Sequence, residues 1–285
     1  MNWQLLLAVS VLLYSISIIL QRVLLKNYKS DPVSFSIFFQ VGVAIVIGVV
    51  AILMQGKVSL PNLRGLEWSV LVMTISYAFT NIYFFKSLKI IEASRFTVIF
   101  ASSTLFAILA STLFFNEGLT ATQWVGAILI IAGVVVVSIK DTKHNLNTGD
   151  IYALIAAALF GLANANDRFL VKYFDPYSYV VWAFLLPGLL LGIIYPNKLS
   201  QLYIFLKRTV IYKMILLCFI FGLSGITFSV VLQNASNSSE VFSIYAFGAI
   251  VTVLLSIIFL KERSYLIRKV IGAVISLLGL LLVNR

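Results

Sequence analysis

Very few ionisable side chains stand inside the long apolar segments of this 285-residue chain. Asp167 is the best placed of them, near the end of the sequence that runs from Gly161 to Arg168. A carboxylate far from water could bind an amine or carry a proton, which makes Asp167 a candidate for coupling transport to protons. In the alternative interpretation Asp167 caps a helix end at an aqueous interface, because Arg168 and Lys172 follow it closely.

Two asparagines, Asn81 and Asn164, also lie within apolar segments. Tyr77 precedes Asn81 by four residues, so the two side chains share one face of a helix. A buried amide needs a hydrogen-bond partner, which either another helix or a substrate can supply. Aromatic side chains at similar depth extend the set, although such residues also pack against helices or lipid. The candidate substrate-binding residues are Tyr14, Tyr77, Asn81, Asn164, Trp182 and Tyr245.

Three further charged residues stand at the predicted ends of helices. Arg95 could reach an anionic substrate or extend to the membrane surface. Glu117 and Glu262 occur in tight turns before the next apolar segment, where capping of a helix N-terminus is a sufficient role for each.

The chain lacks the motifs of the common enzyme classes. It has no glycine-rich phosphate loop and no Cys/His spacing that could hold a metal. Its single histidine, His144, falls in a polar segment, and its single cysteine, Cys218, falls in an apolar one. We therefore expect no catalytic residues, no metal site and no cofactor.

The composition indicates an integral membrane protein. Hydrophobic residues make up 61% of the chain and charged residues only 11%, against about 25% in soluble domains. A helix that crosses the hydrocarbon core needs about 20 mostly apolar residues. Read this way, the sequence predicts an all-α protein with ten transmembrane helices, at residues 3–25, 33–54, 67–88, 93–115, 121–139, 150–171, 177–195, 210–232, 239–259 and 266–283.

The two halves of the chain repeat a set of features at a nearly constant spacing. Asp31-Pro32 recurs 144 residues later as Asp175-Pro176, and Glu117 recurs 145 residues later as Glu262. Arg22 with Lys26, and Gly126 with Gly133, recur at 146 residues. These features recur in one order over the whole length and predict two repeats, residues 1–143 and 144–285. Because each repeat has an odd number of spans, the second must be inverted relative to the first, as in many secondary transporters.

The turns between the last two spans of each half carry a family resemblance. The sequence Phe115-Asn116-Glu117-Gly118-Leu119, with Gln123-Trp124-Val125-Gly126-Ala127 after it, resembles the EamA-like branch of the drug/metabolite transporter superfamily. Leu260-Lys261-Glu262-Arg263 and Ile271-Gly272-Ala273 are similar, although Lys269 stands where the first copy has Trp124. The resemblance implies ten helices, a central cavity between the halves, and export or exchange of small metabolites such as amino acids.

The distribution of positive charge and the family precedent predict opposite orientations. With ten spans, 16 of the 21 Lys and Arg residues fall on one side of the membrane. Because cytoplasmic loops carry the excess of Lys and Arg, this count places both termini outside. Relatives in the superfamily commonly have both termini inside, so the orientation stays open.

The leading functional hypothesis is a secondary transporter that moves small polar metabolites by alternating access. One alternative is a carrier of drugs or lipid headgroups, and another is a membrane scaffold subunit without transport. The expected partners are the lipid bilayer and a small-molecule substrate. Despite a net charge of +11 we expect no nucleic acid, because the basic residues stand at the ends of apolar segments. The expected location is the plasma membrane of a bacterium or archaeon, as a multi-pass protein; the oligomeric state stays open.

Overall fold

The computed structural model describes residues 3–27, 30–115, 120–138, 147–234, 248–262 and 265–283, and these residues form helices and short connections without a strand. The long helices are α1 (Trp3–Asn27), α2 (Pro32–Gln55), α3 (Glu67–Ile90), α4 (Ala93–Phe100), α5 (Ser103–Phe115), α6 (Ala121–Ser138), α7 (Thr148–Leu170), α8 (Pro176–Ile194), α11 (Arg208–Asn234), α13 (Gly248–Phe259) and α14 (Leu266–Val283). Three short helices follow α8: α9 (Pro196–Leu199), η1 (Ser200–Leu202) and α10 (Tyr203–Leu206).

Several of these helices can cross a membrane. Within the described residues, α1, α2, α3, α7, α8 and α11 are long and apolar enough to span it, and shorter apolar helices accompany them. The helices lie where the sequence predicted spans, with the ninth described only from Gly248. The chain is therefore a multi-pass membrane protein, whereas the exact number of ten spans stays a prediction.

The fourth predicted span is divided into two helices. The chain turns at Ala101 and Ser102, where the amide of Ser102 bonds to the carbonyl of Ile99 at 3.1 Å instead of to the residue four positions back. The Ser102 hydroxyl donates to the same carbonyl at 2.7 Å. A hydroxyl that competes for backbone acceptors bends a helix, which accounts for the break between α4 and α5.

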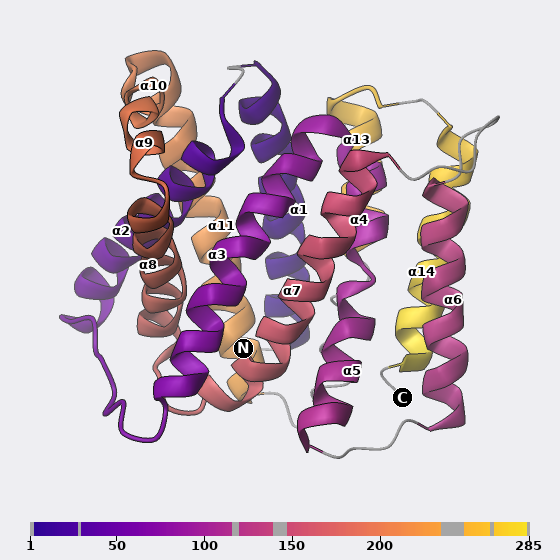
Figure 1. The fold of residues 1–285 in the computed structure, drawn as a ribbon, viewed down its shortest axis with the longest axis horizontal. Helices are drawn as coiled ribbons and strands as arrows, with labels where there is room; N and C mark the ends of the chain where they lie inside the picture. The colour runs from indigo at the N-terminus through magenta and orange to yellow at the C-terminus, as the bar shows by residue number, and fades with distance from the viewer. Residues whose placement is uncertain are drawn as a thin grey trace.

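The packing of the helices is nearly unchanged when the two halves are exchanged. Helices α3 and α5 of the first half pack on α7, the first helix of the second half. In the same way, α11 and α13 of the second half pack on α1, the first helix of the first half. The helices α2 and α8 pair with each other, and so do α6 and α14, which stand side by side at one edge of the molecule (Figure 1).

Close approach between α6 and α14 depends on glycine. A Cβ atom at Gly133 would lie 2.6 Å from the carbonyl oxygen of Gly272, and one at Gly279 would lie 2.6 Å from the carbonyl oxygen of Gly126. No side chain fits at these distances. The repeated glycines are thus the residues that allow the last helices of the two halves to touch.

The two ends of the bundle are easily told apart. Helix α1 begins and α14 ends at the same end of the molecule (Figure 1). We call this the opposite end. The charged end is the other one, where α1 ends and where α4, α7 and α14 begin.

The two Asp-Pro sequences begin α2 at the charged end and α8 at the opposite end. Asp31 Oδ1 accepts from the amides of Val33 and Ser34 at 3.0 and 3.1 Å, and Asp175 Oδ1 accepts from the amide of Ser178 at 2.9 Å. Partial burial works to raise the pKa of each carboxyl, but these amide bonds, with Lys198 beside Asp31 and the Ser178 and Ser59 hydroxyls beside Asp175, lower it more. The pKa of each therefore lies below its ordinary value.

Each of these caps also binds the connection that follows the matching helix of the other half. Lys198, which comes after α8, forms an ion pair with Asp31 at 3.1 Å between Nζ and Oδ2. Ser59, which comes after α2, donates its hydroxyl to Asp175. The inverted repeat predicts this reciprocal arrangement.

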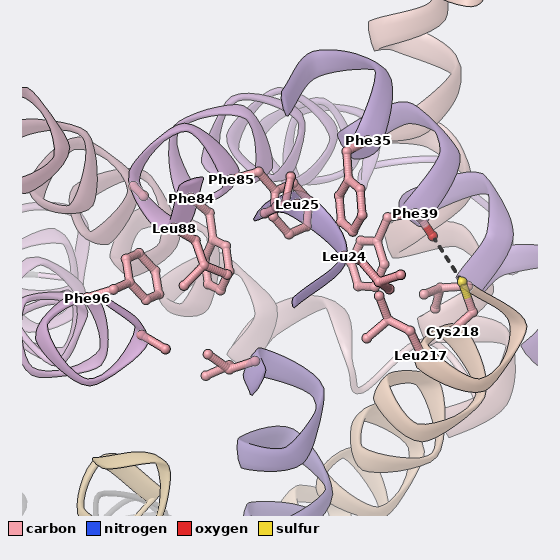
Figure 2. Packing of buried hydrophobic residues seen from close by; sticks show 14 of the residues in the cluster. Leu24, Leu25, Phe35, Phe39, Phe84, Phe85, Leu88, Phe96, Leu217 and Cys218 are labelled. Atoms are coloured by element: carbon pink, nitrogen blue, oxygen red, sulfur yellow. Dashed lines mark hydrogen bonds between the residues drawn. The ribbon is translucent and has the colours of Figure 1, made fainter. Parts of the chain in front are cut away.

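An aromatic cluster fills the bundle on the side toward the charged end. Phe35 and Phe39 of α2 lie against Phe85 of α3, with ring centroids 4.8 and 5.4 Å away, and Phe84 lies 4.4 Å from Phe96 of α4 (Figure 2). Edge-to-face contacts at these distances stabilise packing beyond the burial of area alone. Many isoleucine and leucine side chains on the outer helix faces are exposed, as expected for a surface that meets lipid.

Candidate functional site

A cavity of about 230 Å³ lies inside the bundle, and both halves line it. Tyr14, Tyr77 and Phe100 line it from the first half, and Asn164, Phe184 and Phe228 are among the lining residues of the second. On α7, α8 and α11 the lining residues belong to the parts of these helices nearer the opposite end. On α1 and α3 the lining extends further toward the charged end, to Gln21 and Phe84, so Phe84 of the aromatic cluster forms part of the cavity wall on that side.

The lining is strongly aromatic and carries one carboxylate. Nine of the lining residues are Phe or Tyr. Asp167 is the one acidic residue among the described lining residues, and none of them is Lys, Arg or His. Uncharged polar groups, including Gln21, Thr80 and Ser229, make up most of the remaining polar surface.

Asp167 lies on the cavity wall and not at a free helix end. The Tyr77 hydroxyl, on α3, donates to Asp167 Oδ2. Asp167 Oδ1 is buried and accepts no hydrogen bond from the described residues. The Tyr179 hydroxyl, on α8, is buried nearby and interacts electrostatically with Asp167. This placement favours the interpretation of Asp167 as a cavity carboxylate over that of an interfacial cap.

Tyr14, Tyr77, Asn81 and Asn164 line the same cavity as Asp167. The Asn81 side-chain nitrogen donates to the carbonyl oxygen of Tyr77 at 2.9 Å, within its own helix. A substrate is therefore not required to satisfy that donor. This weakens one argument for Asn81 as a binding residue while leaving its position on the wall unchanged.

Of the two remaining candidates, Trp182 and Tyr245, the structure describes only Trp182. Trp182 does not line the cavity; its indole nitrogen donates to the carbonyl oxygen of Ser59 at 3.0 Å, in the connection between α2 and α3. It thus fixes the loop that also binds Asp175. Tyr245 lies outside the described residues.

Sequence reasoning missed Tyr179 and Gln21, which line the cavity. Tyr179 stands in the first turn of α8, between other aromatic residues, where no spacing in the sequence separates a cavity tyrosine from an interfacial one. Gln21 stands beside Arg22 within the first predicted span, where no pattern in the sequence marks it as a cavity residue. Only the packing of α1 and α8 against other helices reveals their position.

At the charged end, Glu262 joins the two halves. Its carboxylate accepts from the amides of Ala93 and Ser94 at 3.1 and 3.2 Å, and from the Ser94 hydroxyl at 3.0 Å. It also lies 3.7 Å from Nε of Arg22, with both side chains buried. Glu262 thus caps α4 of the first half, whereas the sequence had suggested a role within its own turn; Glu117 lies outside the described residues.

Two more ion pairs surround this contact. Lys269 of α14 binds Glu92, directly before α4. Arg95 holds Asp150 of α7 through two parallel bonds, Nε to Oδ1 at 2.8 Å and Nη2 to Oδ2 at 2.6 Å. Arg95 is therefore neither a free anion ligand nor a residue extended to the membrane surface. Glu262, Arg22, Glu92 and Lys269 are called the charged cluster below.

No group of three or more His, Cys, Asp or Glu side chains in the described ranges could hold a metal ion. Cys218 is buried in the aromatic cluster, with its sulfur 3.8 Å from the carbonyl oxygen of Phe39 (Figure 2).

Comparison with known proteins identifies the family. A search of curated proteins found no match. Among 26 matching chains of solved structures, one described as "Crystal structure of protein" is 15% identical and superposes with a TM-score of 0.62 over 99% of this chain and 96% of its own. This likeness shows a shared fold. A family model for EamA-like transporters matches residues 1–139 and again residues 147–285, which confirms the resemblance found in the sequence. The chain belongs to the EamA-like transporter family.

Proposed function

We propose that this protein is a secondary transporter that moves small polar metabolites, such as amino acids, by alternating access. Membership of the EamA-like family implies a membrane transporter of the drug/metabolite type rather than an enzyme. The observation that carries the proposal is the cavity between the two halves, with the Asp167 carboxylate on its wall. Ionisable groups at this depth mark substrate or proton pathways.

The proposal includes ten spans in two inverted repeats, divided near residue 143. The exchange symmetry of the helix packing supports it, because α3 on α7 and α11 on α1 are equivalent contacts of inverted halves. The reciprocal contacts of Asp31 and Asp175 support it from a second, independent set of residues.

Alternating access requires one end of the cavity to be closed while the other is open. At the charged end, the charged cluster links α1 and α4 to α14 and to the turn before it. Release of substrate toward that end would require Glu262 to leave Ala93 and Ser94. We therefore assign the charged cluster to the closed side of this conformation.

The size of the cavity argues against a carrier of large drugs or lipid headgroups. Sites for drug-sized ligands have volumes of about 300–1,000 Å³. This cavity, at about 230 Å³, suits a molecule the size of a single amino acid. A scaffold subunit remains the alternative of another class, and a transport measurement separates the two.

The test is exchange by purified protein in liposomes loaded with a mixture of unlabelled amino acids and amines. We expect uptake of radiolabelled solutes that depends on the protein and on the internal load. Asn164→Leu and Asn81→Leu should reduce uptake while membrane insertion is unchanged, because leucine makes each span more hydrophobic. Absence of exchange for every solute, with the protein folded in the liposomes, would favour the scaffold.

Proton coupling is tested at Asp167. Asp167→Asn keeps the shape of the side chain and removes its ability to ionise. We expect exchange of amino acids to persist in this variant while their accumulation driven by an imposed pH gradient falls. Equal pH-driven accumulation in the variant and the original protein would remove Asp167 from the coupling mechanism.

A further inference from the structure

The wall of the cavity carries buried oxygen atoms that form no hydrogen bond with the described residues, although the Tyr179 hydroxyl lies near Asp167. Asp167 Oδ1, Gln21 Oε1 and Thr80 Oγ1 are buried, line the cavity, and have no hydrogen-bond partner among the described residues. Unsatisfied buried acceptors are costly, and one of them belongs to a carboxylate. A ligand that supplies N–H donors would relieve this cost.

The charge of the lining gives the sign of that ligand. Asp167 is acidic, and the described lining residues include no Lys, Arg or His. A buried carboxylate needs a positive partner, whereas the carboxylate of a zwitterion or an anion would meet no cationic side chain among the described lining residues. An ammonium group therefore suits the cavity better than either.

The aromatic residues of the lining indicate the chemical nature of the rest of the ligand. Phe160 lies 6.0 Å from the Tyr77 ring, centroid to centroid, and Phe184 lies 5.4 Å from Phe221. All four rings line the cavity. Ring faces attract a nearby cation and pack well against an apolar or aromatic body.

From these observations we propose that the preferred substrates are small protonated amines with an apolar or aromatic body, and that their ammonium group binds Asp167 beside Tyr77. The inference rests on the proposed function, because it treats the cavity as the substrate site. It narrows that function, since it ranks amines above zwitterionic amino acids of the same size.

The test uses four probes that share one phenyl ring and a short chain: 2-phenylethylamine, its N,N,N-trimethyl derivative, L-phenylalanine and 3-phenylpropionate. Binding to purified protein in detergent is measured at pH 7 by calorimetric titration, which does not require transport. We expect the primary amine to bind at least tenfold more tightly than the zwitterion and the anion. The primary amine should also bind more tightly than the trimethyl derivative, which carries the charge without N–H donors.

Two variants and one control locate the binding group. Asp167→Asn should weaken amine binding at least tenfold, and Tyr77→Phe should weaken it less, because only the donor to Asp167 is lost. Glu67→Gln removes an exposed carboxylate near the start of α3, outside the cavity lining, and should leave amine binding unchanged. If Asp167→Asn fails to fold, Tyr77→Phe still tests the site.

The outcomes separate the two proposals. Amine binding no tighter than that of the zwitterion or the anion, or unchanged by both cavity variants, would overturn the substrate class. Preference for the trimethyl derivative would overturn the role of N–H donors. If the amine does not bind but liposomes exchange L-phenylalanine, the transporter proposal stands and this inference fails. If the amine binds through Asp167 and no solute is exchanged, the inference about the ligand stands and transport fails.

Discussion

Asp31 and Asp175 begin equivalent helices at opposite ends of the bundle, and their surroundings differ in charge. Asp31 pairs with Lys198, whereas Asp175 accepts from the hydroxyl of Ser59. The same contrast holds more widely. At the charged end the halves are linked by Glu262 with Arg22 and by Glu92 with Lys269. At the opposite end the donors are uncharged: the Ser59 hydroxyl donates to Asp175, and the Trp182 indole donates to the carbonyl of Ser59.

The comparison teaches that the repeat preserves geometry and not chemistry. A helix N-terminus needs an acceptor at its first amides, and aspartate supplies it in both halves. The second contact of each aspartate can be made by any donor, so each end uses the donors that its side of the membrane carries. The ten-span prediction concentrates Lys and Arg on one side of the membrane, and at the charged end the donor to Asp31 is Lys198.

The largest predicted effect concerns which compartment the charged end faces. If the positive charges mark the cytoplasmic side, a reporter fused after residue 285 is active only outside the cytoplasm. The readout is all or none, with a reporter in the connection between α1 and α2 as the internal control. A cytoplasmic signal at the C-terminus would show that the family precedent outweighs the charge count.

Removal of the charge from the charged end should destabilise the protein strongly. Glu262→Ala deprives α4 of its cap and removes the carboxylate that pairs with the buried Arg22, which keeps only its bond to the Leu88 carbonyl and the more distant charge of Glu92; we expect this to cost about 3–5 kcal/mol of unfolding free energy. The measurement is unfolding in detergent by heat or denaturant.

The matched change at the opposite end is Ser59→Ala, which removes the hydroxyl that donates to the Asp175 carboxylate and should cost about 1.5–3 kcal/mol, less than the loss of the buried ion pair. Glu67→Gln, at an exposed carboxylate, serves as the control for loss of charge alone. Equal destabilisation by Glu262→Ala and Ser59→Ala would contradict the contrast between the two ends.

Among the described residues, the contact between α6 and α14 involves neither ion pairs nor side-chain hydrogen bonds to a carboxylate. Its contribution to stability should depend only on the volume of the side chains there. Gly133→Ala places a methyl group against the backbone of Gly272, with an expected cost of about 1–3 kcal/mol. Gly48 of α2 has nothing within 4 Å of the added atom, so Gly48→Ala should be neutral or slightly stabilising, as alanine favours the helix. Thermal unfolding of both variants compares them; equal midpoints would refute the close approach.

The smallest predicted effect is a difference between the two aspartates in how their contributions to stability depend on pH and salt. Because the folded pKa of each carboxyl lies below its ordinary value of 3.8, each contributes stability that is present above about pH 4 and is lost as the pH falls through the folded pKa. Asp31→Asn and Asp175→Asn should each flatten this acid dependence slightly. Added salt should weaken the contribution of Asp31, which faces Lys198, more than that of Asp175. The same salt response for both would show that the ion pair with Lys198 contributes nothing.

The sequence predicted the positions of the helices well because apolar runs of membrane length leave few alternatives. It also predicted the equivalence of the Asp-Pro sequences, because the same two residues recur at the matching position of the second half. The break at Ala101 was not predictable, because Ser102 and Thr104 are tolerated in straight membrane helices and bend them only in some settings.

The site was predictable in part. Asp167 and Tyr77 stand out as polar groups in apolar segments, and the structure places them in contact. Their relation to Tyr179 and Gln21 depends on how α1, α7 and α8 pack, which no single segment records. Trp182 was selected for its depth and residue type, yet its indole nitrogen donates a hydrogen bond to the backbone carbonyl of Ser59. Depth in the membrane does not decide which way a side chain points.

The cap on α4 has a consequence for the movement of the protein. A helix capped by its own neighbouring residues keeps the cap when it moves, but α4 takes its acceptor from Glu262, in the other half of the chain. Any separation of the halves at the charged end leaves the amides of Ala93 and Ser94 without that acceptor, at the positive end of a helix dipole. Water or a dissolved anion must take its place. The rate and salt dependence of opening at this end would then report on the solvation of two backbone amides as much as on the substrate.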